Sequence, residues 1–328
     1  MRLLVLGGTR FVGRALVETA LERGHDVTCL NRGVTGRVPD GVRRLTADRT
    51  DRTQLANALG DSTWDAVVDT WASAPRTVAD AAEVLRHKAS RYAYVSSRSV
   101  CDPVRPPGGD ESAVVVDADP NGESTTYPRD KRGGELAVLA HHADPLLLRA
   151  GLVLGPYEDI GRLPWWLDRI ARGGRVVAPG RPDRPLQFVD ARDLAQFALG
   201  RLETGAGGTF DVAGPRGQCT TEELLEACVE VTGSDAELVW VDEADLAAAG
   251  VQPWTQLPCW LPEDSEAAGL LDGDTSRAAA AGLVCRPVEQ TVADTWAWLQ
   301  AEGLPVQRAD RPVHGLPVEL ERRLLGGD

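Results

Sequence analysis

The chain has 328 residues, 43% of them hydrophobic, enough for one large domain or two smaller ones around a sizeable core. Acidic residues outnumber basic ones by 49 to 35, which gives a formal net charge of −14. A surface of this sign repels phosphate backbones, so we expect no nucleic-acid partner.

Nothing in the sequence indicates a membrane or secretory role. The first residues predict a core strand rather than a signal peptide, and no apolar run approaches membrane-spanning length. The six cysteines are scattered without a C-x-x-C pair, and the five histidines form no H-x-x-x-H pattern. We therefore expect reduced thiols, a cytoplasmic protein, no membrane contact and no metal site.

The first thirty residues predict a strand, a glycine-rich turn, a helix and a second strand. Residues 2–6 are a continuous apolar run, typical of a buried parallel strand. Residues 11–21 have apolar side chains at helical spacing and are followed by Gly24, and residues 25–30 form the second strand. The turn directs backbone N–H groups and a helix N-terminus at one point, which suits a pyrophosphate. The alternative is a tight turn without a ligand.

The end of the second strand bears on the choice of dinucleotide. An acidic residue there would bond the ribose 2′-OH of NAD, whereas an arginine accommodates the 2′-phosphate of NADP. The sequence has Asn31 and then Arg32, and Arg10 in the glycine-rich turn adds a second cation within possible reach. We predict NADP(H) as the cofactor. NAD(H) is the alternative, with Arg32 as a solvated loop residue.

The turn over residues 7–13 (GGTRFVG) resembles that of the extended and atypical short-chain dehydrogenases/reductases, the NAD-dependent epimerase/dehydratase-like family. Members often have G-x-x-G-x-x-G here, and Arg10 stands where the middle glycine would be. The chloroplast stem-loop-binding proteins have a similar turn, but the acidic composition argues against RNA binding. The resemblance implies an α/β fold with a Rossmann-type, doubly wound parallel sheet and a smaller C-terminal substrate domain.

The next segments predict two more strands and the rest of the cofactor site. Residues 43–49 and 64–70 are expected to be the third and fourth strands with their exits, and Pro75 opens a helix. The resemblance places Asp48 against the adenine ring, although Asp48 could instead cap the helix that begins near Thr53. The expected cofactor-binding residues are Gly7, Thr9, Arg10, Phe11, Val12, Gly13, Asn31, Arg32, Asp48, Arg49, Thr70, Ala72 and Lys131.

A first catalytic motif follows the fifth predicted strand, residues 92–97. This strand ends in hydroxyl groups, at the edge where open α/β sheets bind ligands. Residues 97–102 (SRSVCD) resemble the family's S-x-x-V-Y-G, which implies that Ser97 is the catalytic serine or threonine and that Cys101 replaces the usual tyrosine. A loop rich in proline and glycine is predicted over residues 102–126.

A second catalytic motif, Tyr127-x-x-x-Lys131, lies on a predicted helix that runs to about His141. The spacing places the phenol and the ammonium group on one helix face, where the cation favours the phenolate. Such a tyrosine exchanges a proton with a carbonyl or hydroxyl group near neutral pH. The motif follows Ser97 by about thirty residues, in the order that the family uses. The alternative is a surface ion-pair face.

The second half of the chain predicts elements that, in the family, alternate between the sheet and the substrate domain. Helices are expected over 163–171, after Asp190, over 220–231 and over 287–301, and strands over 145–156, 175–180, 207–214 and 238–241. The domains expected from this alternation are a Rossmann domain over 1–160 with returning segments at about 185–214, a substrate domain over 161–184 and 215–303, and a peripheral tail over 304–328.

Substrate contacts are expected from aromatic and polar side chains near the strand ends and in the loop over 252–262. The candidates are Trp71, Ser99, Trp165, Trp166, Gln187, Trp254 and Trp260, with Phe188 as a further one. Core packing is the alternative for Trp71, Trp165, Trp166, Gln187 and Phe188. The tryptophans favour a small, apolar substrate. The R-x-x-N variant found after the sixth strand in nucleotide-sugar members is absent, which weakens a nucleotide-sugar substrate.

The resemblance implies an NADP(H)-dependent oxidoreductase in which Tyr127 exchanges the proton, Ser97 bonds the substrate oxygen and Lys131 holds the nicotinamide ribose. An epimerase with tightly held NAD would use the same residues on a sugar-like substrate. A 4,6-dehydratase is disfavoured, because Arg98 and Ser99 stand where those relatives have an Asp-Glu pair. A non-catalytic dinucleotide-binding protein is a third possibility. Pairing through the helix of Tyr127, as in extended relatives, would make a homodimer.

Overall fold

A seven-stranded sheet is the centre of the protein. The computed structural model describes residues 1–34, 36, 38–101 and 107–327; residues 102–106 of the predicted loop lie outside this part. The sheet consists of β1 (Arg2–Leu6), β2 (Asp26–Asn31), β3 (Arg43–Thr46), β4 (Trp64–Asp69), β5 (Ala89–Ser97), β6 (Leu146–Ala150) and β11 (Gly208–Val212). The order is β11-β6-β5-β4-β1-β2-β3 and every neighbouring pair is parallel, which confirms the predicted Rossmann-type sheet.

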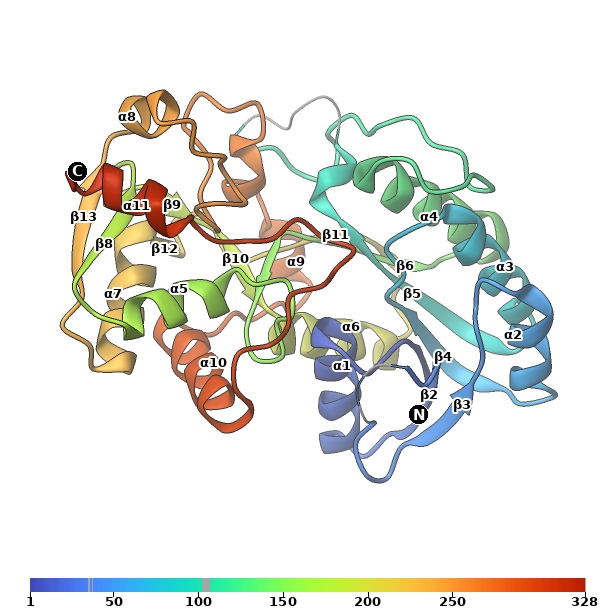
Figure 1. The fold of residues 1–328 in the computed structure, drawn as a ribbon. Coiled ribbons are helices and arrows are strands. Elements are labelled where there is room, and N and C mark those ends of the chain that lie inside the picture. Colours follow the sequence, from blue (N-terminus) through green and yellow to red (C-terminus); the bar gives the residue numbers. More distant parts are fainter. Residues whose placement is uncertain (35, 37, 102–106, 328) are drawn as a thin grey trace.

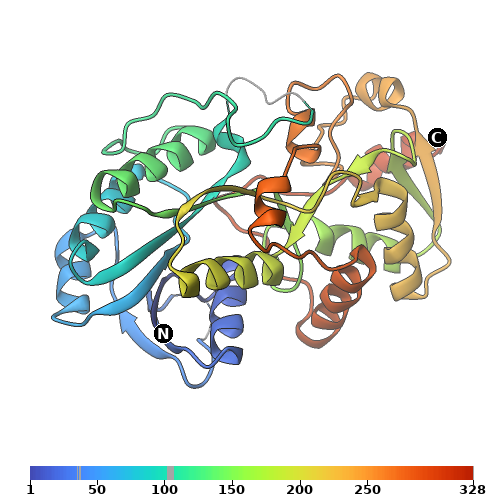
Figure 2. The same cartoon turned by 180° about the vertical axis from the view of Figure 1, so that it is seen from behind.

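Helices cover both faces of the sheet (Figures 1 and 2). Successive side chains of a strand point to opposite faces, so a strand buried on both faces must be apolar throughout, as β1 is. Leu3 and Val5 pack toward α1 and α6, and Leu4 and Leu6 pack toward α2, α3 and α4. The bounds of these helices are α1 (Phe11–Glu22), α2 (Arg52–Leu59), α3 (Pro75–Leu85), α4 (Tyr127–His141) and α6 (Ala191–Thr204).

The strand order changes direction between β1 and β4, and this fixes the position of the site. From β1 the chain continues to β2 on one side and later crosses to β4 on the other. In open α/β sheets, ligands bind outside the carboxyl ends of the strands at such a point. Gly7 follows β1 and Thr70 follows β4, and the Thr70 hydroxyl donates a hydrogen bond to the Leu6 carbonyl oxygen at 3.0 Å.

A smaller unit lies beside the sheet, on the left in Figure 1. Trp166, Leu225 and Val292, from three of its helices, belong to one buried apolar cluster. Strands β8 and β13 pair in parallel, and β9 and β12 pair antiparallel. The bounds are α5 (Leu163–Ala171), β8 (Arg175–Pro179), β9 (Pro185–Leu186), β12 (Cys219–Thr220), α7 (Thr221–Thr232), β13 (Glu237–Val241), α8 (Glu243–Ala248), α10 (Val288–Glu302) and α11 (Val318–Leu324).

The remaining elements connect these two parts. The strand predicted with its exit over residues 145–156 corresponds to β6, and the chain leaves the sheet after Gly151, whose N–H group still donates to the Val212 carbonyl oxygen of β11. The segment after Gly151 pairs outside the sheet, β7 with β10, in parallel. The bounds are β7 (Leu152–Leu154), β10 (Phe188–Asp190), α9 (Ser276–Ala280) and two 3₁₀ turns, η1 (Arg98–Val100) and η2 (Ala268–Leu271).

The C-terminal segment is not peripheral. After α10 it runs toward the middle of the molecule and then returns to α11 in the smaller unit (Figure 1). Leu316 and Leu320 are buried in the apolar cluster of that unit. Glu321 pairs with Arg169 of α5 at 2.8 Å. The expectation failed because short apolar positions between prolines show no helical period, and only their partners make them core residues.

The described part of the chain contains neither a membrane-spanning helix nor a cluster of metal ligands. No helix there is long and apolar enough to cross a membrane. No three histidine, cysteine, aspartate or glutamate side chains in the same ranges are grouped so that they could hold a metal ion.

Replacing Leu320 by alanine should lower the free energy of unfolding by about 2–5 kcal/mol, because it removes buried methyl groups and leaves a cavity. Urea denaturation followed by circular dichroism measures the change. Val306→Ala is the matched control in the same segment; Val306 is 91% exposed, and its loss should cost less than about 0.5 kcal/mol. Equally small effects of both substitutions would contradict the packing of this segment.

Candidate active site

Two adjoining cavities open at the carboxyl ends of the strands. The larger cavity has a volume of about 510 Å³ and the smaller one about 380 Å³. Both values lie in the range of about 300–1,000 Å³ that is typical of ligand pockets. Their shared walls contain Tyr127, Ala150, Gly151, Ile160 and Arg162. Two ligands, one in each cavity, would therefore come into contact beside the first turn of α4.

The larger cavity begins at the glycine-rich turn. Gly7 and Gly8 have φ angles of +123° and +94°, which glycine adopts without steric cost. A Cβ on Gly13 would lie 2.8 Å from the backbone nitrogen of Gly8, so only a glycine allows this close approach. Arg10 precedes α1 without a side-chain cap, which leaves the first N–H groups of the helix available to an anion.

The end of β2 forms another wall of this cavity. The Asn31 side-chain oxygen accepts a hydrogen bond from the Gly33 N–H group, while its Nδ2 is buried without a partner among the described residues. Arg32 is exposed and lines the cavity. The donor set at this strand end is thus an amide and a guanidinium group, with no carboxylate lining the cavity beside them.

All but one of the predicted cofactor residues line the larger cavity. They are Gly7, Thr9, Arg10, Phe11, Val12, Gly13, Asn31, Arg32, Arg49, Thr70, Ala72 and Lys131. Asp48 does not line it. The Asp48 carboxylate accepts hydrogen bonds from the Thr50 hydroxyl and N–H groups, which lower its pKa, with a smaller contribution from Arg32. Asp48 does not cap α2 either, since the cap is Asp51.

Arg49 reaches the cavity wall, but its guanidinium group is held by Asp69 at the end of β4. Two hydrogen bonds of 2.6 Å join them, and Tyr92 donates a third to the same carboxylate. Burial alone would raise the pKa of Asp69, but the Arg49 charge and hydrogen bonds outweigh it and lower the pKa. Asp69 also accepts from the Trp71 N–H group, so this buried pair shapes the loop after β4.

Lys131 lies at the floor of the larger cavity and is 3% exposed. Its Nζ donates hydrogen bonds of 2.6 Å to the carbonyl oxygens of Trp71 and Val95, at the ends of β4 and β5. Burial lowers the pKa of Lys131 to about 7. The alternative of a surface ion-pair face is therefore wrong for this residue.

Tyr127 is the first residue of α4 and lies where the two cavities meet. Its ring is 37% exposed and faces the Arg311 guanidinium group, 4.8 Å from the ring centre. Ser97 and Ser99 line the smaller cavity with it. The Ser97 hydroxyl accepts a hydrogen bond from the Ser99 N–H group at 3.1 Å, which fixes the serine at the end of β5. The structure thus brings together the three predicted catalytic residues, with Lys131 on the side of the larger cavity.

The predicted substrate residues separate into two groups. Trp71 lines the larger cavity, and Ser99 and Trp254 line the smaller one. The other candidates line neither cavity: Trp165, Trp166, Gln187 and Trp260, as well as Phe188. Trp166 is buried and donates to the Pro258 carbonyl oxygen at 2.8 Å. The Gln187 side-chain amide is fully hydrogen-bonded inside the protein. Its oxygen accepts from Arg98, and its nitrogen donates to the carbonyl oxygens of Gly214 and Gly273. These side chains support the fold.

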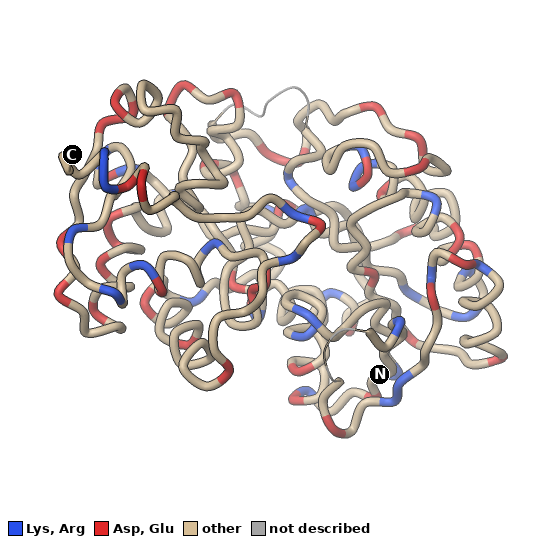
Figure 3. Tube along the Cα trace, viewed as in Figure 1, with Lys and Arg blue, Asp and Glu red and all other residues tan. Residues whose placement is uncertain are grey.

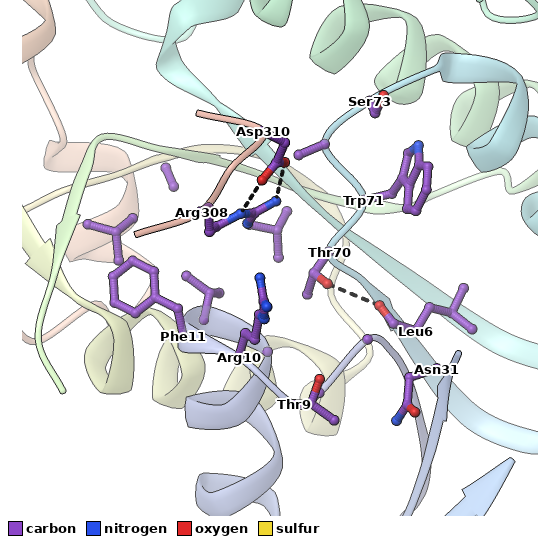
Figure 4. Close-up of a pocket in the computed structure, with 18 of the residues that line it drawn as sticks. Leu6, Thr9, Arg10, Phe11, Asn31, Thr70, Trp71, Ser73, Arg308 and Asp310 are labelled. Carbon is purple, nitrogen blue, oxygen red and sulfur yellow. Dashed lines mark hydrogen bonds and ion pairs between the residues drawn. The ribbon is translucent and has the colours of Figure 1, made fainter. Parts of the chain in front are cut away.

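The sequence did not predict several residues that line the cavities, because they come from the start of α5 and from the C-terminal segment. They are Arg162, Arg308, Asp310, Arg311, Pro312 and His314. Figure 4 shows the Arg308–Asp310 pair, at 2.6 Å, above Arg10 in the larger cavity. Arg10 itself pairs with Asp159 at 3.3 Å. The only signal in the sequence was the run of alternating charges QRADRPVH, which has no helical or strand period.

Residues 3–213 match the NAD dependent epimerase/dehydratase family, and the chain belongs to this family. It is an NAD(P)-dependent enzyme of the extended short-chain dehydrogenase/reductase type, as the sequence motifs predicted.

Three curated proteins are similar to the chain over most of its length. A Haloferax volcanii protein named a probable low-salt glycan biosynthesis reductase is 26% identical, over 73% of this chain and 83% of that protein. The 3-diazoavenalumate denitrifying reductase of a Streptomyces species is 27% identical, over 65% and 75%. The chloroplast stem-loop binding protein of 41 kDa b of Arabidopsis thaliana is 25% identical, over 71% of this chain and 63% of that protein.

Solved structures share the fold at lower identity. The Bordetella bronchiseptica enzyme WbmH in complex with NAD+ has a TM-score of 0.70 and 20% identity, over 92% of this chain and 99% of that chain. A UDP-glucose 4-epimerase has a TM-score of 0.70 and 16% identity, over 94% of this chain and 100% of that one. Both likenesses concern the whole fold, including the smaller unit.

The substitution Gly13→Ala should weaken dinucleotide binding at least about tenfold, because the new methyl group meets the Gly8 backbone and opens the turn. Fluorescence titration with NADH and NADPH measures the affinity. Gly200→Ala is the matched control: it also places an alanine in a helix, but outside the helix's own backbone nothing lies within 4 Å of the added Cβ. Unchanged affinity in Gly13→Ala, with a native circular dichroism spectrum, would argue against a phosphate site at this turn.

Proposed function

We propose that this member of the epimerase/dehydratase family is an NADP(H)-dependent reductase. It would transfer hydride between the nicotinamide and a carbonyl or hydroxyl carbon of a small metabolite. The observation that supports this most strongly is the position of Tyr127, which lines both cavities. A proton donor at that junction would stand beside the reacting oxygen of a substrate while the dinucleotide fills the larger cavity.

The dinucleotide, when bound, supplies or accepts the hydride. In reduction, the Tyr127 hydroxyl gives its proton to the substrate oxygen, and Ser97 donates a hydrogen bond to the same oxygen. Lys131, between two carbonyl oxygens at the ends of β4 and β5, would hold the nicotinamide ribose and favour the tyrosinate that remains. Acid–base help of this kind contributes about 10²–10⁴-fold to the rate.

The larger cavity suits a dinucleotide on three observations. The uncapped N-terminus of α1 and the bare glycine backbone face a pyrophosphate position. The buried Asn31 amide nitrogen lacks a partner among the described residues. The preference for NADP(H) depends on Arg32, which is exposed at the end of β2, because Arg10 is already paired with Asp159.

The similar proteins support a reductase and also keep one alternative open. Two of the curated relatives are named reductases. The solved structures, however, include epimerases and complexes with NAD, so an epimerase with tightly held NAD acting on a sugar-like substrate is the second candidate. Nicotinamide that copurifies with the protein as NAD and stays bound through turnover would favour the epimerase.

Removing the guanidinium group in Arg32→Ala should weaken NADPH binding at least about tenfold and change NADH binding less than about twofold, because only the former has a 2′-phosphate to pair with it. Isothermal titration calorimetry measures the affinity for NADPH and for NADH, in the unmodified protein and in Arg32→Ala. Arg43→Ala, which removes an exposed arginine of β3 outside the cavity, is the control. NADH binding as tight as NADPH binding in the unmodified protein would refute the NADP(H) preference.

Deleting one hydroxyl group in Tyr127→Phe should reduce hydride transfer about 10²–10⁴-fold while the affinity for the cofactor stays within about threefold. The assay follows reduced nicotinamide by absorbance with any aldehyde or ketone that the unmodified protein reduces. Tyr157→Phe serves as the control, since Tyr157 lines neither cavity. Full activity in Tyr127→Phe would exclude this tyrosine as the proton donor.

A further inference from the structure

We propose that the smaller cavity binds a compact organic anion, with its carboxylate or phosphate group between Arg162 and Arg311 and its reacting carbon near Tyr127. This inference rests on the proposed reductase function and adds the chemical class of the substrate. It replaces a purely apolar substrate with one that has an apolar body and a negatively charged end.

The charge of the smaller cavity is opposite to that of the protein. Acidic residues are in excess over the whole chain, and Figure 3 shows them in both parts of the molecule. Among the described residues that line this cavity there is no aspartate or glutamate, whereas three arginines and a histidine are present. Arg98 is balanced by Asp211, whose carboxylate oxygen lies 3.6 Å from its Nε. Arg162 and Arg311 remain as the cations available to a ligand.

Neither of these two arginines forms an ion pair within the described part of the chain. Glu158 interacts electrostatically with Arg162 and accepts hydrogen bonds from the Arg162 and Leu163 N–H groups. Burial raises the pKa of Glu158 to about 7, so near neutral pH this carboxylate is only partly ionised and offsets the Arg162 charge incompletely. The cavity therefore keeps a positive field.

Buried donors in the cavity wall lack partners. The Nε atoms of Arg162 and Arg311 are both buried and make no hydrogen bond among the described residues. Arg162 uses Nη1 to bond the Val153 carbonyl oxygen at 3.1 Å, which anchors the side chain and leaves other N–H groups of its fork unused. A buried donor without a partner is costly, and a guanidinium fork matches a carboxylate or phosphate in shape and charge. An anion in the cavity would pair with the charge of the two guanidinium groups that line it.

The C-terminal segment holds Arg311 in place. The Gln307 side chain closes a loop by donating to the His314 carbonyl oxygen at 3.1 Å and accepting from the His314 N–H group at 2.7 Å. The Arg308 N–H group donates to the Asp159 carbonyl oxygen at 3.1 Å, just before α5 begins. The loop that carries Arg311 is thereby fixed to the segment that carries Arg162. The two cations are preorganised, which reduces the entropic cost of binding.

Beside the arginines, the histidine and a few hydroxyl groups, the walls of the smaller cavity are apolar, and they limit the size of the ligand. Leu152, Ile160, Trp254, Leu270 and Pro312 line it. A volume of about 380 Å³ is near the lower end of the range for ligand pockets, which favours a compact molecule. His314 adds a polar but uncharged group, because burial, and then Arg162, lower its pKa. The cavity thus fits a small apolar body with one anionic group.

The test compares benzoate and phenyl phosphate with the neutral benzamide, by calorimetry on the full chain with and without NADP+. At least one anion should bind about tenfold more tightly than benzamide. This preference should fall at least about fivefold in both Arg162→Gln and Arg311→Gln, and Arg311→Lys should retain part of it. The tighter of the two anions identifies the group as a carboxylate or a phosphate.

The matched control is Arg181→Gln, which removes an exposed arginine of the smaller unit outside both cavities and should keep the preference. Circular dichroism checks that each variant is folded. Equal binding of benzamide and the anions, binding of none of the three probes, or an unchanged preference in both arginine variants would overturn the proposal. Because these measurements need no turnover, anion binding that persists without any NADP(H) binding would contradict the reductase function and support the anion site.

Discussion

A buried lysine connects the parts of this protein on which its chemistry depends. Lys131 comes from α4, yet its Nζ donates to carbonyl oxygens at the ends of β4 and β5. Without these two bonds the lysine would be buried without hydrogen-bond partners, which is costly. Their contact sets the distance of α4 from the sheet. Tyr127, one helical turn earlier, is thereby placed where the two cavities meet.

Further buried charges surround this contact and position the same strand ends. Arg49 and Asp69 fix the loop after β4. Glu135 on α4 accepts hydrogen bonds from Ser96 at 2.7 Å and from Arg149 at 2.8 Å, which joins the helix to β5 and β6. Buried ion pairs of this kind contribute little net stability, because desolvation offsets much of their attraction. Their effect here is to give the cavity walls one geometry.

The C-terminal segment adds charged side chains to a site whose other residues come mainly from the sheet and α4. The sheet and α4 provide the glycine turn, the tyrosine and the serine that are expected of the family, and these suit any of several reactions. The 307–314 loop adds charged groups to both cavities, Arg308 and Asp310 to the larger one and Arg311 to the smaller one. The family match ends at residue 213, so this segment lies outside the part of the chain that the family shares.

The sequence by itself determined the parallel sheet, the helices beside it and the glycine turn, because these depend on local periodicity and on backbone conformations that glycine allows. It predicted the Tyr127-x-x-x-Lys131 face from the order of the motifs and the family resemblance, because this spacing alone occurs by chance on many helices. It could not decide whether Gln187 and Trp166 line the substrate pocket or pack in the core, because a polar or aromatic side chain suits either role until its partner is known. Only the tertiary structure decided that the C-terminal segment returns to the site. Arg162 and Arg311 line the same cavity there, and the contacts between distant parts of the chain that place them leave no period in the sequence.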